Sequence, residues 1–117
     1  MRRGYVIATG LALSLTLADG ASAQQSAVRG SPAAGRDLAM HECDSCHIVA
    51  KNQDIRPLVG GYAPSFFDIA NKPTTTGASL QAFISHPHGY SNMPYPDLAA
   101  TDVDNVVAYI LSLRGKP

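Results

Sequence analysis

The stretch Cys43-Asp44-Ser45-Cys46-His47 decides the fold of this chain. Two cysteines separated by two residues and followed directly by a histidine form an attachment site for covalently bound haem. On a helix, positions i, i+3 and i+4 share one face, so both sulfurs and the imidazole can reach one porphyrin. A Cys-x-x-Cys pair alone would also suit a redox dithiol or half of a zinc site. The adjacent histidine favours haem, with thioethers at Cys43 and Cys46 and with His47 on the iron.

The first 23 residues have the composition of a secretory signal peptide. Arg2 and Arg3 precede the apolar run YVIATGLALSLTLA (5–18), and the small residues ASA (21–23) offer a cleavage site. The alternative is an uncleaved anchor, but this run is short for a membrane span of about 20 residues. We therefore expect a signal peptide over 1–23 and a periplasmic mature protein without a membrane span.

The expected mature chain is one small domain of nearly balanced charge. The whole chain has nine basic and nine acidic residues, and the first 23 residues contain two of the arginines and one aspartate. A strongly basic surface, which a nucleic-acid partner would require, is therefore not expected. A domain of this size usually needs a covalent or metal staple, and haem would supply it. We expect a flexible linker over 24–31 and a single haem-binding domain over 32–117.

Apolar residues recur at helical spacing through this domain, and no stretch alternates as a strand would. We therefore expect an all-α domain. Ser31 followed by Pro32 predicts the start of a first helix that runs to about His47. A short helix is expected over 65–71, and loops rich in proline and glycine are expected over 48–63 and 86–98.

Two further helices are expected in the second half of the chain. One starts at Thr76 or Ser79 and carries Leu80, Phe83 and Ile84 at helical spacing. The last helix is expected to be capped by Thr101, with Asp104 three residues later, and to end at Gly115. Its predicted inward face consists of Val103, Val106, Val107 and Ile110.

Met93 is the expected sixth ligand of the iron. It lies between Asn92 and Pro94 in a proline-rich stretch, where a stiff backbone can hold a thioether in place. Haem bound by His47 has one axial position left, and its occupant decides what the protein does. His86 and His88 are rival ligands from the same stretch. On the first helix, Met40 is expected to pack beside the porphyrin and His41 to be solvated.

The chain resembles a class I monohaem cytochrome c of the small bacterial type. The resemblance covers essentially all of the mature part. It is carried by CDSCH (43–47), APSF (63–66), LQAFISHP (80–87), MP (93–94) and VVAYI (106–110). It implies a cytochrome c fold of about four short helices packed around one covalently attached haem c.

The resemblance also implies roles for particular residues. Gly35 and Tyr109 match positions where the first and last helices of the family cross closely. Pro64 matches a proline whose carbonyl accepts a hydrogen bond from Nδ1 of the proximal histidine, here His47. Phe83 stands where many relatives have a tryptophan that donates to a haem propionate. Phenylalanine cannot donate, so this contact is expected from another residue. The candidates are Tyr90, Tyr95 and Arg56.

These features together predict a periplasmic electron carrier that is not an enzyme. With His47 and Met93 both on the iron, little geometry would change when an electron arrives. Donor and acceptor proteins are expected to dock weakly at the exposed haem edge, and the carrier is expected to be monomeric or weakly associating. Two alternatives remain open. One is a cytochrome subunit dedicated to a periplasmic dehydrogenase or oxidase, and the other is a five-coordinate haem sensor or enzyme.

Overall fold

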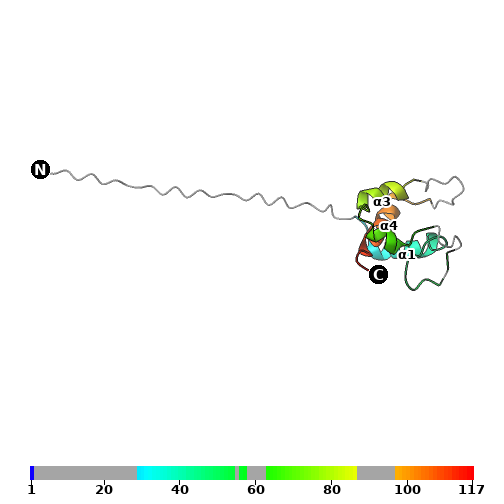
Figure 1. Ribbon diagram of the computed structural model, residues 1–117. Helices are drawn as coiled ribbons and strands as arrows, with labels where there is room; N and C mark the ends of the chain where they lie inside the picture. Colours follow the sequence, from blue (N-terminus) through cyan, green and yellow to red (C-terminus); the bar gives the residue numbers. More distant parts are fainter. Residues whose placement is uncertain (2–28, 55, 58–62, 87–96) are drawn as a thin grey trace.

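The computed structural model describes residues 1, 29–54, 56–57, 63–86 and 97–117. This part of the chain contains four helices (Figure 1). They are α1 (Pro32–Glu42), α2 (Phe66–Asn71), α3 (Gly77–Ile84) and α4 (Ala100–Ser112). No strand occurs among the described residues, and the expected all-α fold is confirmed. No helix in these ranges is long and apolar enough to cross a membrane. The predicted signal peptide lies outside the described residues except for Met1.

Three helices begin where a hydroxyl side chain can cap them. Ser31 Oγ accepts a hydrogen bond from Ala34 N, 3.3 Å away, at the start of α1. At α3, Thr76 Oγ1 accepts from Ser79 N at 3.0 Å and Ser79 Oγ accepts from Thr76 N at 2.9 Å. Ser65 caps α2 in the same way. Each bond satisfies an N–H that the start of a helix leaves without a partner. The predicted start at Ser31 is confirmed, the third helix starts at Thr76 and not at Ser79, and Ser65 caps the expected short helix.

The first helix ends earlier than predicted. α1 stops at Glu42, and Cys43 is its C-cap with φ −117° and ψ −19°. The φ angle of Cys43 is more negative than that of a helical residue, so the chain leaves the helix axis at Cys43. A separate hydrogen-bonded turn follows, in which the N–H groups of Cys46 and His47 both donate to the Cys43 carbonyl, at 3.2 and 2.8 Å. The Cys-x-x-Cys-His motif therefore lies on a hydrogen-bonded turn after α1 and not on the helix itself. Its Cys43, Cys46 and His47 keep the spacing of one helical turn.

The predicted cap of the last helix was also misplaced. The N-cap of α4 is Ala99, which has no side-chain acceptor, and not Thr101. Asp102 Oδ2 accepts from Ala99 N at 3.3 Å, which is the carboxylate half of a capping box. Asp104 instead accepts from Gln81 Nε2 of α3 at 3.1 Å. The helix begins before its first hydroxyl residue because Asp102 satisfies the backbone at Ala99.

α4 forms the centre of the core, and α1, α2 and α3 all pack against it. Its predicted inward face is confirmed, since Val103, Val106, Val107 and Ile110 are all buried. From α3, Leu80 is buried, Ile84 is half-buried and Phe83 is 60% exposed. Gly77 faces Val107 and Leu111 of α4.

α1 crosses α4 with direct backbone contact at Gly35. A Cβ atom built on Gly35 would lie 1.9 Å from the Asn105 carbonyl oxygen and 2.9 Å from Tyr109 Cβ. Only glycine allows this approach, which confirms the Gly35–Tyr109 crossing expected from the resemblance. Just before α1, Ser31 N donates to Asn105 Oδ1 at 2.7 Å, so the end of the predicted linker is held against α4.

Gly35→Ala is expected to destabilise the haem-loaded domain. The new Cβ would overlap the α4 backbone, so the helices must separate, at a cost of roughly 1–3 kcal/mol or more in the free energy of unfolding. Gly77→Ala is a matched control, since its Cβ would make only an ordinary contact, 3.6 Å from Leu111 Cδ1. Denaturant unfolding of both variants tests this expectation. Equal midpoints for Gly35→Ala and wild type would contradict the crossing.

Candidate haem site

The ring of His47 is fixed by a hydrogen bond to Pro64. Its Nδ1 lies 2.7 Å from the Pro64 carbonyl oxygen. A carbonyl oxygen can only accept, so Nδ1 carries a proton, and in the neutral imidazole the lone pair is then on Nε2. The Phe66 ring packs against the imidazole, with centroids 5.4 Å apart and planes tilted by 52°. His47 is therefore held in the tautomer that presents Nε2 to a metal, which is the arrangement of a proximal ligand.

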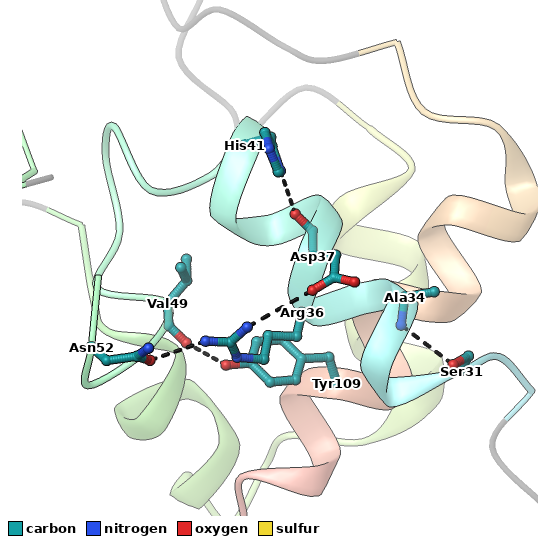
Figure 2. A network of polar contacts seen from close by, with 8 residues as sticks. All are labelled: Ser31, Ala34, Arg36, Asp37, His41, Val49, Asn52 and Tyr109. Atoms are coloured by element: carbon teal, nitrogen blue, oxygen red, sulfur yellow. Dashed lines mark hydrogen bonds and ion pairs between the residues drawn. The ribbon is translucent and has the colours of Figure 1, made fainter. Parts of the chain in front are cut away.

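The segment after His47 is tied to the helical core. Phe66 N, at the start of α2, donates to the Ile48 carbonyl at 2.9 Å. Tyr109 of α4 donates its hydroxyl proton to the Val49 carbonyl at 2.7 Å in a buried contact (Figure 2). Burial raises the pKa of Tyr109 and nearby Arg36 opposes that shift, so the phenol stays protonated as a donor. These two bonds connect the position of His47 to α2 and α4.

Arg36 extends this network along the surface of α1. Its guanidinium donates to Asn52 Oδ1 at 3.0 Å and lies 3.8 Å from an Asp37 carboxylate oxygen (Figure 2). Both partners are exposed, so the ion pair contributes little to stability. The contact with Asn52 nevertheless joins α1 to the loop that follows the Cys-x-x-Cys-His motif.

Cys43 and Cys46 are unpaired and half-buried. Burial, followed by the charges of Glu42, Asp44 and Cys46, raises the pKa of the Cys43 thiol to about 11. A redox dithiol or a zinc ligand needs a thiolate, which this environment disfavours. No group of three or more His, Cys, Asp or Glu side chains that could hold a metal ion occurs among the described residues. The surroundings of Cys43 suit a sulfur atom in an uncharged thioether.

The expected distal ligand Met93 and its rival His88 lie outside the described residues, as do Tyr90 and Tyr95. His86 is exposed at the end of α3, and its Nδ1 lies 2.8 Å from the Ala82 carbonyl.

Three other side chains considered from the sequence are described. Met40 is half-buried and packs against the core. His41 is exposed, with Nδ1 2.7 Å from the Asp37 carbonyl (Figure 2). Arg56, a candidate for the propionate contact, is also exposed. The exposure of His41 agrees with its expected solvation. The expected contacts of Met40 with the porphyrin and of Arg56 with a propionate stay predictions.

Sequence reasoning missed two groups that organise the site. Gln53 bonds to the backbone of residues 47–50, and the Tyr109 hydroxyl bonds to Val49 across the core. No sequence motif near Gln53 or Tyr109 predicts either hydrogen bond. Asn105 was missed for the same reason, because a polar residue in mid-helix looks solvated until the partner segment is known.

Comparison with known proteins agrees with this geometry. The family model described as Cytochrome c matches residues 32–114. The chain belongs to the cytochrome c family. This cytochrome c is 36% identical over 94 residues to a protein named cytochrome c-552 from Bradyrhizobium diazoefficiens, an alignment that covers 80% of the chain and 86% of that relative. No solved structure matches the chain.

Membership of this family establishes the cofactor as haem c, with Cys43 and Cys46 as the cysteines of its attachment motif. The described residues fit that group, because the two thiols are unpaired and the His47 tautomer has its lone pair on Nε2. Proteins of this family transfer electrons through haem c, so redox proteins are the partners that the family implies for this cytochrome c.

Proposed function

We propose that this protein is a periplasmic one-electron carrier with His47 and Met93 as the axial ligands of its haem iron. The observation that carries the proposal is the 2.7 Å contact between His47 Nδ1 and the Pro64 carbonyl. It prepares His47 as a proximal ligand with a fixed ring and increased electron donation. Bound haem c supplies the reversible Fe(II)/Fe(III) couple.

The protein side chains set the properties of that couple. A methionine thioether favours Fe(II) and raises the potential relative to a second histidine. If His47 and Met93 fill both axial positions, no coordination site is left for a substrate or a gas. The protein then needs no general base, nucleophile or substrate pocket, and it acts as a carrier and not as an enzyme.

Localisation and partners follow from the same proposal. Bacterial members of the family are usually periplasmic, and the first 23 residues have the features of a secretory signal. Donor and acceptor proteins would meet the carrier in brief, weak complexes with small interfaces. We propose that it works as a monomer between them.

Carbon monoxide binding and a redox titration of the haem-loaded wild type test the proposal. We expect a low-spin spectrum in both oxidation states, a single reversible one-electron transition and no rapid binding of carbon monoxide by the ferrous protein. Immediate carbon monoxide binding would instead support a five-coordinate sensor or enzyme. Stable co-purification with one dehydrogenase or oxidase would support a dedicated subunit.

A further inference from the structure

Gln53 bonds three times to the backbone that follows His47. Its Oε1 accepts from Val49 N at 2.6 Å and from Ala50 N at 3.1 Å, and its Nε2 donates to the His47 carbonyl at 3.2 Å. Its own N–H donates to the Ala50 carbonyl at 3.4 Å, which closes the turn. One carboxamide therefore spans the segment from the proximal histidine to Ala50.

The groups that Gln53 satisfies have little access to water. Val49 is 0% exposed and Ala50 is 4% exposed. A buried backbone N–H without an acceptor is strongly unfavourable, so both need the oxygen of Gln53. Two other bonds of the segment, from Phe66 N to Ile48 O and from Tyr109 Oη to Val49 O, come from the helical core. Gln53 Nε2, in contrast, bonds to the carbonyl of His47 itself.

The chemistry of a neutral amide is required here. The arrangement needs an oxygen that accepts two hydrogen bonds and a nitrogen that donates one, and a carboxamide has both. Glutamate has the same shape but would replace the donor with a second acceptor. That oxygen would then face the His47 carbonyl oxygen at about the distance of the present bond, and the two would repel.

We propose that Gln53 is a positioning residue for the proximal ligand, which holds His47 at one orientation against the haem iron. Pro64 fixes the imidazole ring from its Nδ1 side, and Gln53 fixes the backbone from which that ring projects. The inference rests on His47 being an iron ligand, as in the proposed function. It does not depend on which residue occupies the opposite axial position.

Paramagnetic NMR of the ferric, haem-loaded full chain tests this role, because the shifts of the haem methyl groups depend on the orientation of the axial histidine. We expect Gln53→Glu and Gln53→Ala to change the spread and order of these shifts. Asn52→Asp is a matched control, since it adds the same charge at the adjacent exposed residue and leaves the His47 backbone untouched. It should preserve the wild-type pattern.

Two further measurements separate positioning from stability. Thr76→Ala, which removes the side-chain cap of α3 away from His47, should lower stability and leave the methyl shifts unchanged. Amide exchange at Val49 and Ala50 should be slow in wild type and faster by about tenfold or more in Gln53→Ala. The proposal would be overturned by a Gln53→Glu pattern equal to that of Asn52→Asp, or by rapid exchange of both amides in wild type. Rapid carbon monoxide binding would overturn the carrier proposal and leave this test valid.

Discussion

The Cys43→Ala/Cys46→Ala double variant is expected to contain no covalently bound haem and to be largely unfolded. Each thioether bond needs a cysteine sulfur, so the double variant can form neither bond to the haem. Cys43 packs against the core cluster, and the His47 ring packs against Phe66 of the same cluster. Because the apolar cofactor completes a small core, its binding energy is also folding energy.

Intact mass and far-ultraviolet circular dichroism of purified wild type and double variant check this expectation. Each single variant should keep one thioether and lose part of the helical signal. Ser45→Ala is a suitable control, because Ser45 is exposed within the same motif and has no sulfur. A double variant with wild-type helicity, or a wild-type mass equal to that of the bare chain, would contradict the role of the motif.

Met93→Ala is expected to convert a closed low-spin haem into an open one. Loss of the thioether would leave a ferric iron that is high-spin or water-bound and that takes up cyanide, and a ferrous iron that takes up carbon monoxide. Axial ligands set haem potentials over a range of about 0.8 V, so the midpoint potential should fall by the order of 0.1 V or more.

Absorption spectra and redox titrations of Met93→Ala, His86→Ala and His88→Ala separate the three ligand candidates. The histidine variants should retain the wild-type spectrum and potential. His86 Nδ1 lies 2.8 Å from the Ala82 carbonyl, a contact that leaves Nε2 to face a metal, so His86→Ala is a necessary arm of this comparison. If one histidine variant became high-spin while Met93→Ala did not, the protein would be a bis-histidine cytochrome.

The parts of the fold that could be predicted from the sequence depend on local contacts. Ser31, Ser65 and Thr76 cap helices within four residues of themselves, so their hydroxyl groups are readable signals. The start of α4 was misplaced because Ala99 has no capping group and the signal comes from Asp102 alone. The end of α1 was misplaced because no residue type near Cys43 marks the turn that follows it.

The parts of the site that could not be predicted depend on contacts across the fold. The attachment motif and the His47–Pro64 pairing were expected, the first from spacing and the second from the family resemblance. The Tyr109–Val49 bond joins residues 60 positions apart, and nothing in either sequence neighbourhood indicates it. Gln53 lies close to its partners, but its role becomes visible only when Val49 and Ala50 are known to be buried.

The backbone contact between α1 and α4 also constrains the order of assembly. A chain is synthesised from its N-terminus, so Cys43 and Cys46 exist before Ala100–Ser112 does. α1 has 11 residues, and isolated helices shorter than about 12–15 residues are marginal in water. Until α4 arrives, the Gly35–Asn105 contact cannot form, and the core burial that suppresses ionisation of the Cys43 thiol is incomplete. Packing of α4 against α1 therefore completes the burial that raises the pKa of the Cys43 thiol.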